Sequence, residues 1–247
     1  MNSHLLAVIP ARYGSRRFPG KPLSLIAGKP LLEHLYREAS RARLIERVVV
    51  ATDDKRIYSA VQAFGGDAVY TSSRHRTGSD RSAEVMQKLG GDIIISIQAD
   101  HLGVKAADYD KILKAMLADR GIEYATMACK VDDETTLFDP NRVKVIFDKS
   151  DHALWFSRYP LPYLQGIDGD HVMQFEFYYH IGVYFFRKAA LKEYHRWKPG
   201  TFEKAESLEQ LRILENRRKI KVFKIRRDVI SIDTPEDLKL AETNIFK

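Results

Sequence analysis

The sequence predicts an α/β protein built on a doubly wound, mostly parallel sheet. In its first hundred residues, short apolar runs alternate with segments whose apolar residues recur at helical spacing, and the links between them are short. The run at 92–97 is apolar on both faces, as expected of a central parallel strand. Such sheets carry helices on both faces and bind ligands beyond the carboxyl ends of their strands.

The apolar run from Leu5 to Ile9 predicts the first strand. Further strands are expected at 47–51, 67–70 and 92–97, and helices at 30–43, 54–64 and 79–89. The loops at 10–22, 71–78 and 98–104 follow strands of this series. They are therefore expected at the same edge of the sheet, where a ligand would bind.

The composition changes from about residue 139. Strand-like runs at 142–147 and 153–156 lead to a loop rich in Pro and Gly, and the segment 175–186 holds seven aromatic residues in twelve positions. That segment is expected either to pack in the core or to face a partner subunit or a sugar. A helix at 207–216, a basic strand and a final helix from Pro235 complete the chain. No linker or repeat divides it, so residues 1–247 are expected to form one domain.

Composition excludes several classes of protein. Of the 247 residues, 45% are hydrophobic, and no apolar run approaches the ~20 residues that span a bilayer, so no membrane association is expected. The N-terminus has no basic segment before its first apolar run, which argues against a signal peptide and for a cytoplasmic protein. The single cysteine, Cys129, lies in an apolar run and is expected to be a buried thiol.

The net charge of +7 raises the alternative of a basic nucleic-acid-binding protein. The densest basic segment, at 217–227, alternates Lys with Ile and Val, which is typical of a strand with one solvated face. No helix-turn-helix, zinc-finger or RNP-like pattern accompanies it. A basic excess equally suits an enzyme whose substrates are anions, and we favour that interpretation.

The loop after the first strand holds the most informative pattern. It carries four cations, at Arg12, Arg16, Arg17 and Lys21, together with Gly14 and Gly20. Glycines allow close approach of backbone amides, and clustered cations suit a polyanion such as a triphosphate. The loop is not a Walker motif, because five residues rather than four separate its glycines and Pro22 replaces the magnesium-binding Ser or Thr.

The pattern R-x-G-S-x-R-x-P-G-K-P-L resembles the signature of sugar nucleotidylyltransferases, and this variant most resembles the CMP-Kdo synthetases (3-deoxy-manno-octulosonate cytidylyltransferases). Six further motifs match that family in the same order. They are Thr77-Gly-Ser-Asp-Arg81, Gln98-Ala-Asp100, Phe156-Ser-Arg158, Tyr179-His-Ile-Gly-Val-Tyr184, Ser207-Leu-Glu-Gln-Leu-Arg212 and Ile232-Asp-Thr-Pro-Glu-Asp237. The resemblance covers residues 5 to about 243.

The resemblance implies a Mg²⁺-dependent enzyme that transfers CMP from CTP to Kdo and releases pyrophosphate, for lipopolysaccharide or capsule synthesis. It also implies a homodimer, with an inserted dimerisation and sugar-binding sheet at about 139–190. The implied catalytic residues are Arg12, Lys21, Asp100 and Asp233, of which the two aspartates would bind the metal. Nucleotide contacts would come from Ala11, Arg12, Ser15, Arg17, Lys21, Thr77, Gly78 and Arg81. Sugar contacts would come from Gln98, Arg158, His180, Tyr184, Glu209 and Gln210.

The residues alone leave simpler interpretations open. Asp100 and Asp233 are also ordinary turn or helix-cap residues, and 77–81 is also a glycine turn with a cap. His180 is also compatible with a packed core histidine. Because neighbouring helix positions lie about 100° apart, at most one of Glu209 and Gln210 is expected to be central on one helix face.

One departure from the family pattern affects the expected metal site. Where the family has G-D-E/Q-P, this chain reads Ala99-Asp100-His101-Leu102. The aspartate is kept, but His101 replaces an acidic or amide neighbour, which leaves the strength of metal binding and the identity of the sugar open. The same reaction on 8-amino-Kdo or another ulosonate is the alternative. A GT-A glycosyltransferase is disfavoured because this strand end reads Gln98-Ala-Asp-His101 and not D-x-D.

Overall fold

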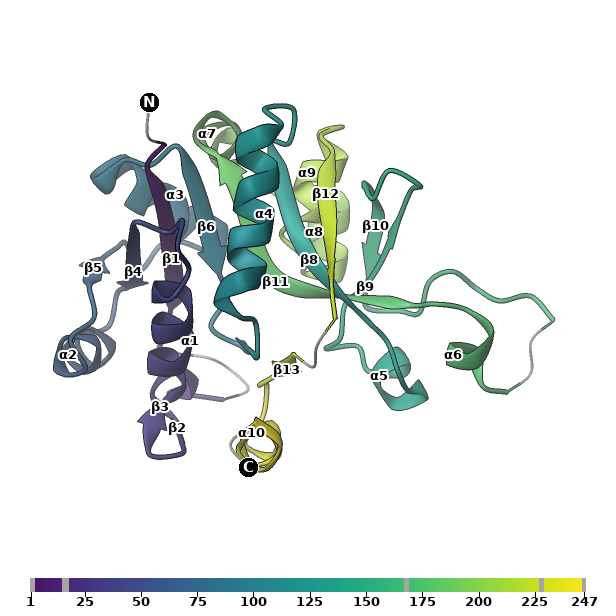
Figure 1. The fold of residues 1–247 in the computed structure, drawn as a ribbon, viewed down its shortest axis with the longest axis horizontal. Helices are drawn as coiled ribbons and strands as arrows, with labels where there is room; N and C mark the ends of the chain where they lie inside the picture. The colour runs from purple at the N-terminus through teal and green to yellow at the C-terminus, as the bar shows by residue number, and fades with distance from the viewer. Residues whose placement is uncertain (1–2, 15–17, 167–168, 227–228, 246–247) are drawn as a thin grey trace.

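The computed structural model describes residues 3–14, 18–166, 169–226 and 229–245. Within these ranges a nine-stranded mixed sheet runs through the molecule, and its main path has the order β10-β9-β11-β6-β1-β4-β5 (Figure 1). The parallel half of this path consists of β6 (Ile93–Ile97), β1 (Leu5–Ala11), β4 (Arg47–Thr52) and β5 (Ala68–Tyr70). This half is the strand series that the alternating pattern predicted.

The second half of the sheet is organised around β11 (Tyr178–Arg187). This long strand pairs antiparallel with β6, with β8 (Tyr124–Lys130) and with β9 (Lys144–Phe147). Two further strands extend it, β10 (Ala153–Ser157) beside β9 and β12 (Ile220–Ile225) parallel to β8. The aromatic segment is thus mainly a core strand, with eight consecutive buried residues from Tyr179 to Phe186.

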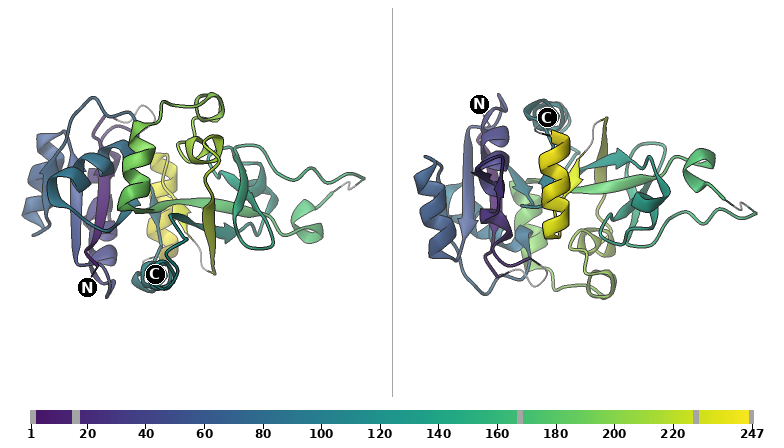
Figure 2. Two further views of the ribbon diagram at one scale, coloured as in Figure 1. Left: turned by 90° about the horizontal axis from the view of Figure 1, so that it is seen from above. Right: turned by 90° about the horizontal axis from the view of Figure 1, so that it is seen from below.

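Helices cover both faces of the sheet, which confirms the doubly wound α/β class (Figure 2). Along β1, Leu5, Ala7 and Ile9 join one buried cluster, whereas Leu6 and Val8 join the other, because successive strand residues point to opposite faces. The first cluster contains residues of α1 (Leu31–Ser40), α2 (Lys55–Ala63) and α4 (Ala106–Ala118). The second contains residues of α3 (Gly78–Leu89), α7 (Lys188–Arg196) and α9 (Leu211–Glu215).

Short elements complete the described chain. Two of them form an antiparallel pair that matters for the site, β7 (His101–Leu102) and β13 (Ile230–Ser231). The others are the 3-10 helix η1 (Lys21–Leu23), β2 (Leu25–Ile26), β3 (Lys29–Pro30), α5 (Glu134–Phe138), α6 (His171–Gln174), α8 (Thr201–Glu206) and α10 (Pro235–Ile245). In the described residues, no helix is long and apolar enough to cross a membrane.

The predicted helix at 207–216 is shorter in the structure, where α9 covers only Leu211–Glu215. Ser207 has φ = +54°, a left-handed conformation that ends α8, and the next helix begins only at Leu211. Residues 208–210 form the intervening turn, so Glu209 and Gln210 do not occupy successive positions within a helix. The expectation that only one of them reaches a given face therefore fails, because its helical premise fails.

Two other expectations were a buried thiol at Cys129 and a strand with one solvated face in the basic segment at 217–227. Cys129 is buried, as expected. On β12, Ile220 and Val222 are buried, while the more exposed Lys224 forms an ion pair with Asp151 at 3.0 Å. The alternation therefore marks a strand with one partly solvated face. The division of the chain into a body and an inserted unit at about 139–190 stays a prediction.

The end of α9 provides a test of backbone strain next to the site. Arg217 has φ = +58°, its N–H donates to the Leu214 carbonyl at 2.9 Å, and the Arg218 N–H donates to the Ile213 carbonyl at 3.1 Å. These two bonds are those of a Schellman motif, whose left-handed position favours glycine. We expect Arg217→Gly to raise the free energy of unfolding by about 1 kcal/mol, measured by urea denaturation.

Arg217→Ala is the matched control, because it removes the same side chain but keeps the Cβ atom. It should give no comparable gain. Equal stability of the Gly and Ala variants would show that the left-handed backbone is not a source of strain here.

Candidate functional site

A cavity of about 740 Å³ opens at the carboxyl edge of β6. Its walls come from seven parts of the chain. They are the segment 74–80, the residues after β6, the segment 141–143, Arg158 at the end of β10, the strand β11, the stretch 195–212 and the segment 231–233. The position agrees with the rule that ligands bind beyond the strand ends of an open α/β sheet. Of the residues proposed from sequence, those lining the cavity are Thr77, Gly78, Gln98, Asp100, Arg158, His180, Tyr184, Glu209, Gln210 and Asp233.

At one end of the cavity, Lys21 lies between two carboxylates. Its Nζ is 3.7 Å from Asp100 Oδ2 and 3.8 Å from Asp233 Oδ1, and it donates a hydrogen bond to the Ile232 carbonyl at 2.8 Å. The three side chains are largely shielded, with exposed fractions of 13% for Lys21, 30% for Asp100 and 11% for Asp233. The structure therefore brings together three of the four residues proposed as catalytic.

The small β7–β13 pair explains why the two aspartates meet. Asp100 directly precedes β7, and Asp233 follows β13 by two residues, so the antiparallel pairing sets the start of one strand beside the end of the other. The Ile232 N–H donates to the Asp100 carbonyl at 2.8 Å, which extends the pairing by one bond. Lys21 is held by η1, whose preceding residue Gly20 has φ = +75° and donates to the Tyr13 carbonyl at 2.9 Å.

His101 turns toward the metal-site candidate rather than toward solvent. Its Nδ1 lies 2.7 Å from Asp100 Oδ1, and its side chain is 14% exposed. Burial by itself raises the pKa of Asp100, but the neighbouring His101 and Lys21 more than compensate and hold that pKa below its ordinary value. Asp100 is therefore ionised in the folded protein at neutral pH.

The backbone of β11 approaches this histidine closely. A Cβ atom at Gly182 would lie 3.0 Å from ring atoms of His101 and 3.1 Å from Gln98 Cγ. Glycine at position 182 thus leaves room for both side chains over the strand. Gly182, His101 and Gln98 all line the cavity, so this close contact forms part of its wall.

Glu209 organises the other side of the cavity. Its Oε1 accepts a hydrogen bond from Gln98 Nε2 at 2.7 Å, and its Oε2 accepts one from the Ser79 N–H at 3.2 Å. Burial raises the pKa of the Glu209 carboxyl, a shift that these hydrogen bonds oppose. Gly78 belongs to the same cluster, because a Cβ there would approach Gln98 Nε2 to 2.4 Å.

Gln210 presents an amide nitrogen without a partner. The Tyr184 hydroxyl donates to Gln210 Oε1 at 2.9 Å, and Gln210 is only 2% exposed. Its Nε2 has no hydrogen-bond partner among the described residues. Because a buried amide donor is costly to leave unpaired, this group is suited to a ligand oxygen. Both Glu209 and Gln210 therefore line the cavity, since both lie in the turn before α9.

His180 lies on β11 and is 5% exposed. Its Nε2 is 2.8 Å from the Thr126 hydroxyl, and its backbone N–H donates to the Val143 carbonyl. Burial, with a smaller contribution from His101, lowers the pKa of His180 to about 3. The ring is therefore neutral at physiological pH. His180 is packed in the core and also lines the cavity. It is therefore compatible both with a core histidine and with a sugar contact, and the sugar contact stays a prediction.

Arg158 also lines the cavity, but its guanidinium is engaged by the backbone. Nε donates to the Glu206 carbonyl at 2.7 Å, and an Nη donates to the Pro140 carbonyl at 2.9 Å. These bonds tie the end of β10 to the end of α8. A role of Arg158 in holding a sugar carboxylate stays a prediction. It would use guanidinium N–H groups that do not take part in these backbone contacts.

The nucleotide-side residues are placed less directly. Arg12 donates to the His75 carbonyl, which links the β1 loop to the segment 74–78. Arg81 is completely buried, donates to the Thr71 hydroxyl and lies 3.3 Å from Asp53. It therefore supports the loop at 71–78 without lining the cavity. Ala11 is the buried last residue of β1. Ser15 and Arg17 lie outside the described residues, and the nucleotide contacts proposed for all of these stay predictions.

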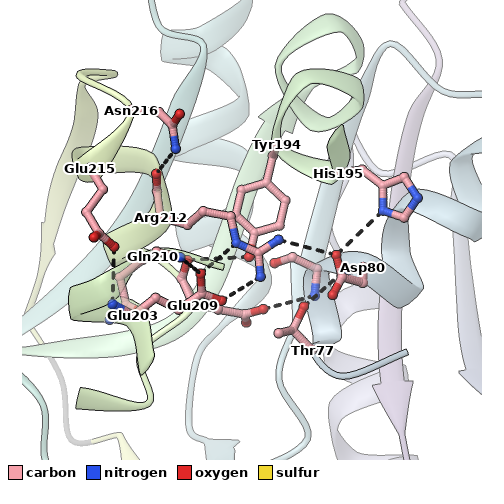
Figure 3. A network of polar contacts seen from close by, with 12 residues as sticks. Thr77, Asp80, Tyr194, His195, Glu203, Glu209, Gln210, Arg212, Glu215 and Asn216 are labelled. Atoms are coloured by element: carbon pink, nitrogen blue, oxygen red, sulfur yellow. Dashed lines mark hydrogen bonds and ion pairs between the residues drawn. The ribbon is translucent and has the colours of Figure 1, made fainter. Parts of the chain in front are cut away.

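A network around Arg212 was not assigned a role from sequence. Arg212 is 2% exposed, its Nε donates to Glu203 Oε2 at 2.7 Å, and an Nη lies 3.6 Å from Asp80 Oδ1 (Figure 3). Its guanidinium also lies over the Tyr194 ring, 4.4 Å from the centroid. It connects α8, α9 and the start of α3 behind Glu209. The sequence contained Arg212 within a matched motif, but its partners Glu203, Tyr194 and Asp80 lie outside that motif.

The carboxylates available for a divalent cation are few. Within the described ranges, no cluster of three or more Asp, Glu, His or Cys side chains has the arrangement of a metal site. Asp100 and Asp233 share the ammonium group of Lys21, so the space between them accommodates a positive charge. Two carboxylates, with phosphate oxygens and water in the other positions, form the usual environment of Mg²⁺ at a nucleotide, so the residues fit that metal.

The chain resembles known proteins over almost its full length. A sequence model of the cytidylyltransferase family matches residues 6–220. The 3-deoxy-manno-octulosonate cytidylyltransferases of Thermodesulfovibrio yellowstonii and Parabacteroides distasonis are 42% and 43% identical to it, each alignment covering 96% of both chains.

Solved structures agree with this similarity. The structure of a CMP:2-keto-3-deoxy-manno-octonic acid synthetase complexed with CTP matches with a TM-score of 0.89, at 37% identity over 99% of each chain. A glucose-1-phosphate thymidylyltransferase from Bacillus anthracis matches with a TM-score of 0.70 at 15% identity, which shows a common fold. The chain belongs to the cytidylyltransferase family, within its group of 3-deoxy-manno-octulosonate cytidylyltransferases.

Proposed function

We propose that the protein transfers CMP from CTP to the anomeric hydroxyl of Kdo and releases pyrophosphate. The observation that carries this proposal is the Lys21–Asp100–Asp233 cluster, whose two carboxylates line the cavity. The remaining lining combines cationic side chains, such as Arg74 and Arg76, with hydrogen-bonding groups, such as Gln98 and Gln210. This arrangement suits a substrate pair with a polyanionic end and a polyhydroxylated end. The full-length similarity to 3-deoxy-manno-octulosonate cytidylyltransferases supports CTP and Kdo as that pair.

In the reaction, the 2-hydroxyl oxygen of the sugar forms a bond to the α-phosphorus of CTP while the bond to the pyrophosphate oxygen breaks. The hydroxyl proton leaves to solvent or to a base, and the negative charge increases on pyrophosphate. Lys21 and Arg12 are the cations that we assign to the phosphate oxygens. Their contribution is electrostatic stabilisation and positioning, without a covalent enzyme intermediate.

Mg²⁺ is part of this proposal, with Asp100 and Asp233 as its protein ligands. When bound, it would polarise the α-phosphate as a Lewis acid. The two carboxylates supply the negative charge that such a cation requires, and β7 and β13 hold them in register.

The acceptor sugar is assigned to the half of the cavity formed by β11 and the turn before α9. Gln98, Glu209 and Gln210 offer hydrogen-bonding groups there, and His180 stays neutral. 8-Amino-Kdo or another ulosonate in the same place is the alternative acceptor. We also propose a cytoplasmic homodimer that supplies lipopolysaccharide or capsule synthesis, supported by exposed apolar residues in or near the predicted dimerisation segment, including Leu154, Tyr159, Tyr163 and Met173.

Pyrophosphate release tests the function. CTP, ATP, GTP and UTP are each supplied with Mg²⁺, alone and with Kdo or 8-amino-Kdo. We expect release only when CTP and Kdo are both present. Release with 8-amino-Kdo instead would reassign the acceptor, and absence of turnover together with salt-dependent binding to DNA or RNA would favour the nucleic-acid-binding alternative.

The two proposed metal ligands provide the next prediction. Asp100→Asn and Asp233→Asn should each lower kcat by about 100-fold or more, because each removes one of the two carboxylates that would hold Mg²⁺ at the reacting phosphates. Steady-state kinetics at several Mg²⁺ concentrations measure this. The control is Asp237→Asn, because Asp237 accepts hydrogen bonds from the backbone N–H groups of residues 233 and 234 at 2.9 Å and so only caps the helix. Near-normal activity of Asp233→Asn at limiting Mg²⁺ would assign Asp233 to capping as well.

Gln210 tests the acceptor half of the cavity. Gln210→Leu keeps similar bulk but removes the unpartnered amide, so the KM for Kdo should rise about tenfold while the KM for CTP stays within twofold. Tyr184→Phe is the control, since it removes only the hydroxyl that orients the amide, and it should have a smaller effect in the same direction. An equal rise in both KM values would assign Gln210 to general packing of the cavity.

The buried His180 predicts a pH dependence of stability. Its pKa falls from 6.5 to about 3 on folding, so between these values the unfolded chain binds a proton that the folded chain does not. The free energy of unfolding should therefore fall as the pH is lowered from about 6.5, by up to about 1.4 kcal/mol per pH unit from this residue. His180→Asn should lose that component.

Urea unfolding at pH 7.5, 6 and 5 measures the effect in the wild type, in His180→Asn and in His4→Asn as a partly exposed histidine control. Parallel pH profiles for all three proteins would contradict a neutral, buried His180.

A further inference from the structure

Lys21 has two incompatible positions in the proposed reaction. In this structure its ammonium group lies between Asp100 and Asp233, at 3.7 and 3.8 Å. A metal ion held by the same two carboxylates would place a divalent charge close to that ammonium group. Because like charges at such distances repel strongly, Lys21 and the metal cannot both occupy the space between the carboxylates.

The contacts of Lys21 allow it to leave. The distances to both carboxylates exceed hydrogen-bonding range, so the attraction is electrostatic, whereas Lys21 donates a hydrogen bond to the Ile232 carbonyl at 2.8 Å. The backbone is fixed independently by η1, in which the Leu23 N–H donates to the Gly20 carbonyl at 2.8 Å. A flexible four-carbon side chain on a fixed backbone can change its contact without a change in the fold.

We propose that Lys21 is an internal counter-cation, which neutralises Asp100 and Asp233 in the metal-free protein and is displaced when a divalent cation binds there. This inference rests on the proposed metal site. It adds that metal loading and the availability of Lys21 for the triphosphate are one coupled event. The bound metal takes over the carboxylates, and the displaced ammonium is then available to phosphate oxygens.

The coupling has two consequences that do not depend on catalysis. Without metal, removal of the Lys21 charge takes a shared ammonium group from Asp233 and leaves His101 beside Asp100, so the protein should be less stable. With metal, the same removal abolishes a competitor, so the divalent cation should bind more tightly. Because Lys21 is proposed to stabilise only the metal-free protein, the same variant should be less stable without metal and bind metal more tightly.

Mn²⁺ binding to the nucleotide-free protein, followed by electron paramagnetic resonance, tests the proposal together with melting temperatures in chelator and in Mn²⁺. In Lys21→Met, we expect Mn²⁺ to bind about tenfold more tightly than in the wild type. The melting temperature in chelator should be lower, and the rise on adding Mn²⁺ larger. Lys21→Arg, which keeps the charge, should stay close to the wild type.

Lys29→Met is the matched control, because it removes an exposed lysine from the same region of the chain and should change neither quantity. Lys21→Gln is a second neutral variant, which provides the measurement if Lys21→Met does not fold. Asp100→Asn should weaken Mn²⁺ binding strongly, and this arm separates the two proposals.

If Asp100→Asn weakens Mn²⁺ binding but both neutral Lys21 variants bind like the wild type, the counter-cation proposal is wrong and the metal site stands. If Asp100→Asn binds Mn²⁺ like the wild type, the assignment of the metal to this site fails, and the counter-cation proposal fails with it.

Discussion

The candidate site depends on the neutralisation of two carboxylates that the fold forces together. Asp100 and Asp233 are separated by more than half of the chain, yet the β7–β13 pairing brings them to the same ammonium group. Two carboxylates this close to one ammonium group repel each other, and the attraction of each to Lys21 opposes that repulsion. Lys21 thus joins the first loop, the end of β6 and the C-terminal segment through charge.

The rest of the cavity depends on hydrogen bonds rather than on charge. Its buried polar groups are held in place by neighbouring side chains and backbone N–H groups. Glu209 is oriented by Gln98 and the Ser79 N–H, and Gln210 is oriented by Tyr184. Behind them, Arg212 satisfies Glu203 and so keeps α8 and α9 together. Each hydrogen bond is modest in net energy, but a missing partner in such a buried setting is costly, so the network specifies one arrangement.

Local patterns in the sequence predicted the parts of this structure that are locally determined. The first four parallel strands and the helices α1, α2 and α3 follow from apolar spacing, because each buries one stripe or both faces against its neighbours. The alternation of strands and helices also placed the loops at 10–22, 71–78 and 98–104 at one edge of the sheet. The motifs from residue 98 onward identified eight of the residues that line the cavity, namely Gln98, Asp100, Arg158, His180, Tyr184, Glu209, Gln210 and Asp233.

What the sequence did not predict depends on contacts between distant residues. The break between α8 and α9 occurs at Ser207, a serine in a left-handed conformation, where neither Gly nor Asn signals a helix end. The carbonyl contacts of Arg158 and the pairing of Lys21 with both aspartates join segments far apart in the chain. No periodicity encodes such contacts, and α4 and β8 were likewise not assigned.

One consequence concerns how this cavity can change in evolution. Its sugar-side wall includes β11, whose residues Tyr179 to Phe186 are buried and which pairs with three other strands of the sheet. A substitution on that wall must therefore also be compatible with the core of the protein. The stretch 195–204, by contrast, reaches the same cavity from the ends of helices and from connecting segments. New acceptor preferences should therefore arise first along that stretch, while the strand preserves the shape inherited from the common ancestor.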